Sequence, residues 1–543
     1  MRAGYLFLMV LTGLATAASG QVKKPGKDTV MKGATIEVIQ AYKPVVKQAP
    51  KPEWVPQLPP PDTIHKAEIY DDVPQQSLFF TYTSMPLHPL ALGKEEQIIP
   101  FRNYIKLGAG NLSTVYIDAG IGAIYGNNFE TALHLHSLTQ KGNIINQRTA
   151  LNGLEFEGTM HNRSGDLHVD VQGESNKYYY YGYNHDLYKI SADSVKQQYN
   201  LIRATIDLQS KGDSNTAFSY HPAISLSGFG AFHNTSEVSA GFDLPFAYKI
   251  ENHLQAQLSV NGALTSFKMD STISNNYVGI LAGFAYNNHL FNGHALLGYV
   301  AGKYKKNYLL PDILASYQLP ETKVGLFAGV QSSFRQNSYE QLTSENPYML
   351  NVYPKLQSSK GEYFIGIQGS YGDHFSFNGR VSYWDFKNLP TFLNNFSDQK
   401  QFMVAYDTNV NAFSVKLGAR YKEANLWTAG ITADFYHYSN GSLPYVWGAP
   451  ATTIRGDVSL TSIPKLILNA CLQIEGGINA QDSHLHNMKL NTFADLCASG
   501  EYQIISRLSV FAQLNNILNN NYQRWLGYQA YGINVYGGLR LKF

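Results

Sequence analysis

The sequence predicts an all-β protein that folds as a transmembrane antiparallel β-barrel of about 22 strands. Three observations lead to this fold class: the composition, an export signal at the N-terminus, and segments of alternating polarity over most of the chain. The 543 residues include 38 tyrosines and 46 glycines, and only 15% of the residues are charged. Such a composition favours strands over charged amphipathic helices. The formal net charge of +2 is too small to indicate a nucleic-acid partner.

The first 20 residues are predicted to be a signal peptide. Arg2 supplies the positive start, residues 5–15 form the apolar stretch, and Ala18, Ser19 and Gly20 form a small-residue cleavage site. The apolar stretch is too short to span a bilayer, and no other run approaches the ~18 apolar residues of a membrane helix. We therefore expect an exported chain without a membrane helix.

Residues 21–100 are predicted to form a proline-rich, irregular periplasmic leader. Eleven of the 22 prolines fall between Pro44 and Pro100. Because proline lacks an amide donor and fixes φ, this density disfavours both helices and central strands. The barrel is therefore expected to occupy residues 101–543.

The last barrel strand is predicted over residues 531–543, where polarity alternates with a period of two. This period places one apolar and one polar face on opposite sides of a strand. The apolar face comprises Tyr531, Ile533, Val535, Gly537, Leu539, Leu541 and Phe543, and the polar face comprises Asn534, Tyr536, Gly538, Arg540 and Lys542.

Three other segments carry aromatic residues at both ends of an apolar face, eight residues apart. At about 3.3 Å per residue this spacing is roughly 26 Å along the strand, close to the apolar band of a membrane barrel. The opposite faces carry charges, which are costly in a dry sandwich core but not in a hydrated lumen. The pattern therefore favours a barrel over a soluble sandwich. The aromatic pairs are Phe375 and Tyr383, Phe413 and Tyr421, and Trp427 and Phe435.

The strand count follows from the alternation of long external loops with short periplasmic turns. Counts made from the two ends of the chain agree only if residues 401–421 form one long strand with a bulge near Asp407, Thr408 and Asn409. This interpretation reduces 23 segments to 22, an even number, with 18 to 20 as the alternative. Long connections are expected near 178–197, 335–361, 386–399, 439–449, 479–488 and 518–530, and short ones near 162–166, 211–215 and 288–291.

The C-terminal segment resembles the last two strands of TonB-dependent receptors. It reads Phe-Ala-Gln-Leu-Asn-Asn-Ile-Leu over residues 511–518, then Tyr522, and ends at Phe543. Tyrosine-rich blocks at 178–183, 337–339 and 346–348 resemble a Bacteroidetes group of receptor-like barrels. The resemblance implies an outer-membrane protein that takes up or passes a nutrient, in contact with outer-membrane lipid.

One departure from that family concerns the plug and its energy coupling. Gated members carry a globular plug ahead of the first strand, and the leader 21–100 is too short and too rich in proline for a complete one. The segment Thr35-Ile36-Glu37-Val38-Ile39 resembles the short motif that contacts TonB. TonB, or a surface or periplasmic protein, is accordingly a candidate partner.

Phe543, with Leu541 and Leu539 on the same face, resembles the C-terminal signal that is read by the outer-membrane assembly machinery. The same residues also have an ordinary role as the lipid face of the last strand. The two interpretations are compatible, and the assembly machinery is an expected partner.

Histidines and carboxylates on three neighbouring predicted strands share the lumen side. Two histidines separated by one residue point the same way on a strand and could share a metal. Imidazoles and carboxylates in a wet lumen need no ligand, so a polar lining is the expected role, with no resident metal or cofactor. The residues are His134, His136, Glu155, Glu157, His161 and His168, with Asp170 beside them.

Five tyrosines lie at the end of a predicted strand and in the external connection that follows it. Tyrosines at this height form the aromatic girdle of a membrane barrel, or stack on a sugar or peptide ligand. The girdle is the expected role, and ligand binding is the alternative. The residues are Tyr178, Tyr179, Tyr180, Tyr181 and Tyr183.

Cys471 and Cys497 are predicted to lie opposite each other on neighbouring strands. The hairpin that joins the two strands is centred near residue 484, midway between the cysteines, and both side chains share the lumen face. Directly opposed residues have Cβ atoms about 5 Å apart, and the periplasm permits disulfides. A disulfide between them is therefore allowed, and a register slip of two residues would separate them.

The sequence contains no HExxH, GxSxG or Walker motif, and we identify no catalytic residues. The favoured hypothesis is a receptor-like or channel barrel for nutrient uptake. The alternative is a structural or accessory barrel that anchors an envelope assembly through its leader and loops. An outer-membrane enzyme would require an acid/base pair at the barrel rim, which the sequence does not reveal.

Overall fold

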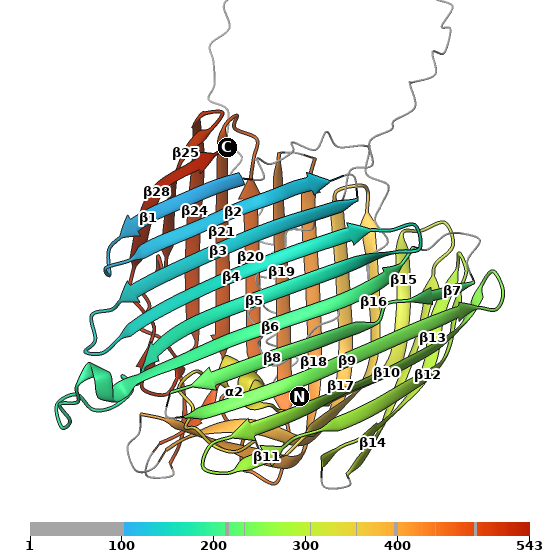
Figure 1. Cartoon of the computed structure of the whole chain (residues 1–543), viewed down its shortest axis with the longest axis horizontal. Helices are drawn as coiled ribbons and strands as arrows, with labels where there is room; N and C mark the ends of the chain where they lie inside the picture. The colour runs from blue at the N-terminus through green and yellow to red at the C-terminus, as the bar shows by residue number, and fades with distance from the viewer. Residues whose placement is uncertain are drawn as a thin grey trace, which may run out of the picture. The chain divides into compact units, whose positions relative to one another are not determined.

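The computed structural model describes residues 103–543 apart from residues 127, 212–216, 233, 304–305, 355, 396–399, 425, 440 and 483–485. The predicted signal peptide and leader lie outside the described residues. Strands make up most of the described chain (Figure 1). Within these ranges, no helix is both long and apolar enough to cross a bilayer.

Twenty-two antiparallel strands form the barrel wall, as the turn-parity argument predicted. The wall strands are β1 (Asn103–Gly110), β2 (Val115–Gly126), β3 (Phe129–Lys141), β4 (Arg148–His161), β5 (Gly165–Tyr179), β6 (Lys196–Ser210), β8 (Ala223–Ala231), β9 (Thr235–Lys249), β10 (Leu254–Lys268), β12 (Tyr277–Asn287), β13 (Phe291–Ala301), β14 (Asn307–Gln318), β15 (Val324–Arg335), β16 (Ser358–Tyr371), β17 (Phe375–Asn394), β18 (Phe402–Glu423), β19 (Trp427–Tyr438), β20 (Thr452–Leu460), β21 (Leu466–Gly476), β24 (Phe493–Ile505), β25 (Leu508–Asn515) and β28 (Asn534–Lys542).

Short strands and helices lie in the connections between the wall strands. Two three-residue strands extend the sheet, β7 beside β9 and β11 beside β10. The others belong to connections at one end of the barrel. The short elements are β7 (Phe218–Tyr220), β11 (Thr272–Ser274), β22 (Asn479–Gln481), β23 (Asn487–Lys489), β26 (Gln523–Trp525), β27 (Tyr528–Gln529), the 3-10 helix η1 (Ala192–Val195) and the α-helix α2 (Tyr339–Glu345).

The ring closes between the first and the last strand. β1 pairs antiparallel with β28, and Leu107 lies opposite Leu539. Beyond the last strand, the backbone N–H of Phe543 donates to the carbonyl of Asn103 at 3.0 Å. Closure leaves no open sheet edge, which is the condition for crossing a bilayer with strands.

Side chains alternate between the outer surface and the lumen as the sequence predicted. On β17, Val381 and Tyr383 are 39% and 49% exposed on the outside, whereas Arg380 and Ser382 are buried on the inside. On β28, Leu539 and Leu541 are exposed in the same way. A wall of exposed aliphatic and aromatic side chains is unfavourable in water and favourable in lipid. The outer surface is therefore the lipid face.

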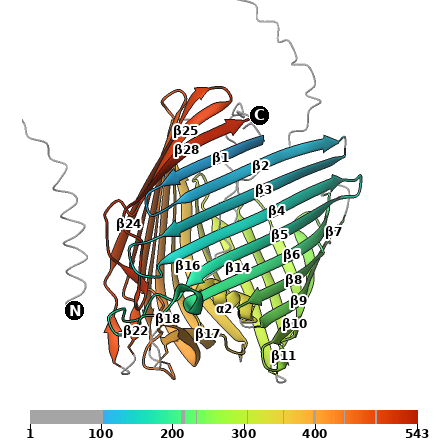
Figure 2. The same cartoon turned by 60° about the vertical axis from the view of Figure 1, so that its left-hand side comes forward.

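The two ends of the barrel carry connections of different length. The end at which β1 begins and β28 ends has short turns such as 162–164 and 372–374. The opposite end, lower in Figures 1 and 2, has long loops such as 336–357, 439–451 and 516–533. Bacterial barrels place short turns in the periplasm, so the end with long loops is the external one.

Three details differ from the sequence predictions. β18 is one long strand, as expected, but its register with β17 does not shift near Asp407; only the pair Asn388 and Thr408 is missing, and Asn388 adopts a positive φ of 52°. β17 also continues to Asn394, so the connection expected at 386–399 begins later. The last strand begins at Asn534 rather than residue 531, because Tyr531 belongs to loop 516–533.

Candidate functional site

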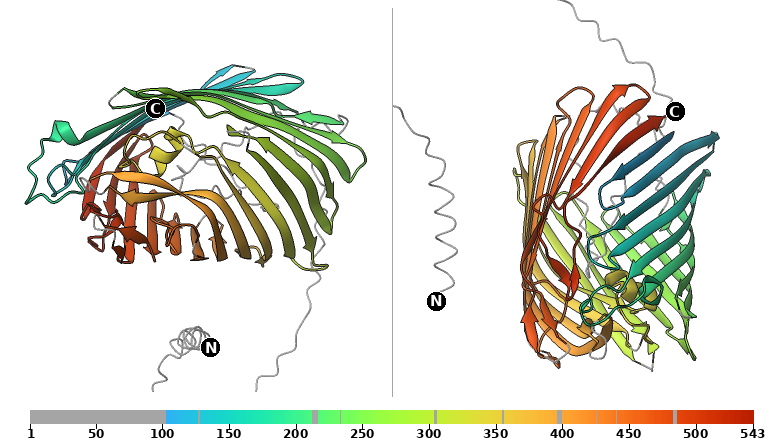
Figure 3. Two further views of the ribbon diagram at one scale, coloured as in Figure 1. Left: turned by 90° about the horizontal axis from the view of Figure 1, so that it is seen from below. Right: turned by 90° about the vertical axis from the view of Figure 1, so that its left-hand side faces the viewer.

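The external end of the lumen is crossed by residues 336–357, which we call the mouth loop. Residue 355 of this loop is not described. The loop connects β15 to β16 and contains α2. Viewed from the external end, α2 lies inside the ring of strands (Figure 3, left).

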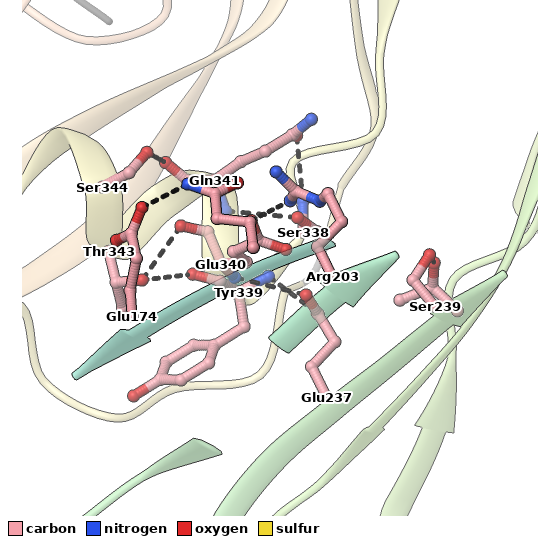
Figure 4. Close-up of polar contacts among 12 residues, drawn as sticks. Glu174, Arg203, Glu237, Ser239, Ser338, Tyr339, Glu340, Gln341, Thr343 and Ser344 are labelled. Atoms are coloured by element: carbon pink, nitrogen blue, oxygen red, sulfur yellow. Dashed lines mark hydrogen bonds and ion pairs between the residues drawn. The ribbon is translucent and has the colours of Figure 1, made fainter. Parts of the chain in front are cut away.

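The first turn of α2 is capped both by the loop itself and by the barrel wall. Ser338 and Gln341 form a capping box with two hydrogen bonds of 3.2 Å. The carboxylate of Glu237 on β9 accepts from the backbone N–H of Tyr339 at 2.8 Å and of Glu340 at 3.2 Å (Figure 4). A helix of one or two turns is marginal in isolation. These acceptors satisfy its first amides and fix it to the wall.

Two contacts between arginine and glutamate side chains also join the loop to the wall. Arg203 on β6 pairs with Glu340, and Arg335 at the end of β15 pairs with Glu345. Glu345 is almost fully buried, and burial raises the pKa of its carboxyl to about 7 although Arg335 and Arg524 lower it. The mouth loop is therefore held partly by a carboxyl group that titrates near neutral pH.

Apolar packing joins the mouth loop to one side of the barrel. Tyr339, Leu342 and Met349 are fully buried. The ring of Tyr339 lies 5.7 Å from that of Phe229 on β8 and 5.0 Å from that of Phe267 on β10, measured between centroids. Burial of each large side chain stabilises the docked loop by roughly 1.5–3 kcal/mol.

The other side of the loop contacts the opposite part of the wall. The backbone N–H of Leu350 donates to the carbonyl of Phe402 at 2.7 Å, and that of Phe402 donates to the carbonyl of Tyr348 at 3.1 Å. The ring of Tyr348 stacks on Tyr528 of loop 516–533 with centroids 3.6 Å apart. β8 and β10 lie at the front in Figure 1, and β18 lies behind them. The loop thus bridges the external mouth from wall to wall.

The predicted tyrosine block takes part in this closure. Tyr180, Tyr181 and Tyr183 are only 6%, 5% and 6% exposed, so the girdle interpretation is wrong for them. They are buried because they follow the end of β5, where the chain leaves the lipid-facing wall and packs against other loops. Tyr181 packs edge-on against Tyr528, and the hydroxyl of Tyr180 donates to the carbonyl of Met349 at 3.2 Å.

A cavity of about 380 Å³ lies beside the mouth loop, at the external ends of β24, β25 and β28. Its walls combine aromatic rings with amide side chains and a few charged groups. Tyr531, which the sequence placed on the lipid face, is one of its lining residues. The lining comprises Gln140, Tyr181, Tyr348, Asp495, Asn515, Asn516, Tyr522, Arg524, Trp525, Tyr528, Gln529, Ala530, Tyr531, Gly532 and Asn534.

A second cavity, of about 440 Å³, lies between the start of the mouth loop and the wall of β6, β8, β9 and β10. Its lining is polar and includes Arg203, Ser225, Glu237, Asp243 and Gln336. The space next to the loop is therefore hydrophilic on this side.

The lumen histidines and carboxylates separate into different groups. Carboxylate oxygens of Glu155, Glu157 and Asp170 lie within 4.8 Å of one another. Among the described histidines nearby, His134 Nε2 lies 3.1 Å from an oxygen of Asp118, and His168 Nδ1 lies 2.8 Å from the Thr159 hydroxyl.

His161 lies between Glu130 and Asp166, with nitrogen–oxygen distances of 3.9 and 3.1 Å. The rings of His134 and His136 have centroids 5.8 Å apart. The three carboxylates are therefore grouped without an imidazole nitrogen, and the described histidines lie against other partners. The polar-lining role stays a prediction.

Cys471 on β21 and Cys497 on β24 are direct cross-strand partners. Their Cα atoms are 5.0 Å apart and their sulfur atoms are joined in a disulfide. The shared face with Glu475, whose side chain is buried toward the lumen side, agrees with the predicted orientation.

Phe543 is 53% exposed at the end of the lipid face, with Leu541 and Leu539 on the same side. This position is compatible with the predicted assembly signal, which stays a prediction.

The sequence interpretation missed most of the residues that hold the mouth loop. Glu237, Arg203 and Tyr528 lie far from residues 336–357 in the chain, and no local pattern links them. Only one signal was available: Ser338 followed three residues later by Gln341 is the pattern of a capping box.

No family model matches this chain, and no curated protein matches it. Solved structures do. The FrpB iron transporter from Neisseria meningitidis (F3-3 variant) matches with a TM-score of 0.65 and 12% identity, over 81% of each chain. A mutant of the ferric enterobactin receptor PfeA from Pseudomonas aeruginosa matches with a TM-score of 0.62 and 11% identity, over 81% of this chain and 80% of that one.

The ferric yersiniabactin uptake receptor FyuA from Yersinia pestis matches with a TM-score of 0.58 and 12% identity, over 81% of this chain and 80% of that one. Identities this low show that the fold is shared, but they do not show which ligand is bound. The chain therefore has the closed 22-strand barrel fold that these transport receptors share, and it is a protein of the bacterial outer membrane.

Proposed function

We propose that this chain is a receptor-type uptake barrel that admits a solute through an external mouth closed by the mouth loop. The observation that carries the proposal is the docking of residues 336–357 on both sides of the lumen, at Glu237 on β9 and at Phe402 on β18. A 22-stranded barrel encloses a lumen wide enough to need an obstruction. The mouth loop can supply this obstruction, and opening would require its hydrogen bonds, its Arg–Glu contacts and its buried apolar side chains to separate from the wall.

The polar lumen supports passage of a hydrophilic solute. The cavity behind the loop is lined by side chains such as Arg203, Ser225 and Asp243. The similar solved structures include an iron transporter, a ferric enterobactin receptor and a ferric yersiniabactin uptake receptor. We infer a transport role of the same general kind for this chain and no catalytic role. The cargo is not inferred from these structures.

Coupling to TonB through residues 35–39 is part of this proposal and rests on the sequence alone, because that segment lies outside the described residues. The lack of a complete plug and an origin among the Bacteroidetes are likewise proposed from the sequence alone. A related prediction is that the leader folds into the lumen and helps to obstruct it.

The test is conductance of the purified full chain in planar bilayers. One variant replaces residues 338–352 by a short Gly-Ser linker, and a second lacks residues 21–95. We expect the native chain to conduct weakly and the loop variant to open stable channels, alone or when combined with the leader deletion. A barrel that stays closed with both obstructions removed would overturn the passage role and favour an anchoring barrel.

The matched control shortens loop 439–451, another long external loop. This loop packs on the wall through Val446, which lies in a buried cluster with Trp384 and Phe386. Its described contacts are with the wall and with Arg524 of loop 516–533 rather than with residues 336–357, so its shortening should raise conductance less than replacement of the mouth loop does. An equal increase in both loop variants would indicate general damage to the barrel and contradict a specific role for the mouth loop.

A further inference from the structure

The cavity beside Tyr348 and Tyr528 has features of a ligand site that the barrel wall alone does not require. Its volume of about 380 Å³ falls within the roughly 300–1,000 Å³ of small-molecule sites. It lies at the external end, where a solute arrives first. It is also bounded by the mouth loop itself, because Tyr348 belongs to that loop.

The aromatic part of the lining is rigidly held. Tyr528 is stacked on Tyr348 with centroids 3.6 Å apart, and Tyr522 is stacked on Phe493 with centroids 4.0 Å apart. The hydroxyl of Tyr531 lies 3.2 Å from that of Thr149. Fixed ring planes of this kind present flat apolar surfaces at little entropic cost to a ligand.

The polar part of the lining consists mainly of amide side chains. Gln140, Asn515, Asn516, Gln529 and Asn534 all line the cavity. Asn516 and Asn534 are buried and bonded within the protein, Asn516 to the carbonyls of Asn520 and Tyr531, and Asn534 to Gln140, Asn515 and Thr114. A ligand therefore meets mainly the amides of Gln140, Asn515 and Gln529. Each amide offers donors and acceptors in one plane. Such groups suit a ligand whose hydroxyls both donate and accept. They offer no particular advantage to a purely anionic ligand.

The charged groups of the cavity are occupied by one another and by the protein. Arg524 lies 3.3 Å from a carboxylate oxygen of Glu475 and donates to the carbonyl of Gly448 at 2.7 Å. Asp495 accepts from the Tyr522 hydroxyl at 2.7 Å and from the backbone N–H of Asn516 at 3.1 Å. The lining therefore has no surplus of positive charge for a polyanionic chelate.

From this combination we propose that the cavity binds a neutral saccharide of one or two rings, with the ring faces against the tyrosines and the hydroxyls on the amides. The proposal deepens the uptake function and rests on it for its biological use. It also places ligand contact on Tyr348, so an occupied cavity touches the same loop that closes the mouth. Binding itself can be measured independently of transport.

The experiment is saturation-transfer NMR and titration calorimetry on the full chain in a detergent without a sugar headgroup. The probes are maltose, cellobiose and xylobiose as neutral saccharides, a digalacturonate as their anionic counterpart, and a ferric catecholate chelate. We expect at least one neutral disaccharide to bind, the digalacturonate to bind more weakly, and the chelate not to compete.

Two variants and two controls locate the site. Tyr531→Leu removes an aromatic face and Asn515→Leu removes an amide, and each should weaken saccharide binding by about tenfold. Tyr531→Phe keeps the ring and should retain most of the affinity. Tyr188→Leu changes a tyrosine that is 54% exposed in another external loop and should have no effect.

Heat-dependent gel mobility checks that every variant has folded as a barrel. Unchanged saccharide binding in both Tyr531→Leu and Asn515→Leu overturns the assigned site, and binding of the ferric chelate in place of every saccharide overturns the ligand class. Either result leaves the conductance test of the uptake role intact, so the two proposals fail separately.

Discussion

The carboxylate of Glu237 on β9 lies 2.8 Å from the backbone nitrogen of Tyr339, the first residue of α2. A strand of the wall thereby caps a helix that is 102 residues away in the sequence. Because Glu237 belongs to the barrel wall, the position of the mouth loop depends on the closed barrel. It also supplies a direct test of how the loop is held.

Replacement of Glu237 by Ala should release the first turn of α2. The loss of a charged acceptor for two buried amides should destabilise the docked loop by about 1–3 kcal/mol. Hydrogen exchange of the Tyr339 and Glu340 amides measures this change directly. Asp243→Ala is the control, because Asp243 lies on the same strand and accepts from Ser259 rather than from the loop. Equal protection of these amides in all three proteins would contradict the capping role.

The mouth loop should loosen as the pH rises through neutrality. Burial raises the pKa of Glu345 to about 7 in the docked loop. Because the docked state has the higher pKa, it is favoured fully below the ordinary Glu pKa near 4.5, and this stabilisation is lost as the pH passes about 7. The difference can reach about 3 kcal/mol.

Exchange rates of loop amides, corrected for the intrinsic pH dependence, should therefore increase between pH 5 and pH 8. Glu345→Gln removes one of the two buried carboxyls that contact the loop, Glu237 being the other, and should reduce the slope of this part of the profile. A native profile identical to that of the Gln variant would rule out Glu345 as the source.

The disulfide between Cys471 and Cys497 should be detectable in the folded chain and dispensable for its topology. The intact mass without reduction should lack two hydrogens, and maleimide should label both thiols only after reduction. The double variant Cys471→Ala, Cys497→Ala should still form the barrel, since the strand pairing of β21 and β24 does not depend on the bond. Its unfolding free energy should fall by no more than about 3 kcal/mol. Two free thiols in the native protein would contradict the disulfide.

Two neighbouring residues on one strand should differ in the cost of an introduced charge. Leu226 on β8 is 58% exposed on the lipid face, whereas Ser225 lines the polar cavity. Leu226→Arg should cost about 2–4 kcal/mol because it places a charge against lipid, and Ser225→Arg should cost much less. Denaturant titration of refolding into lipid vesicles gives both values. A larger cost at Ser225 would reverse the assignment of inside and outside.

The amino-acid sequence by itself determined the barrel and much of its register. A strand repeats every two residues, so alternation such as that of residues 375–383 identifies the lipid face without knowledge of any neighbour. Loop-length parity then predicted one long strand at β18, and the symmetric position of Cys471 and Cys497 about their hairpin predicted their pairing. Each of these inferences uses contacts that are local or set by a single hairpin.

Only the tertiary structure decided how the mouth is closed. The contacts of Glu237 with Tyr339, of Arg203 with Glu340 and of Tyr348 with Tyr528 join segments that no hairpin connects. The burial of the tyrosines after β5 and the place of Tyr531 in a cavity depend in the same way on loops from distant strands. These segments become neighbours because the sheet closes into a ring, and periodicity along a strand carries no information about which loops then meet across it.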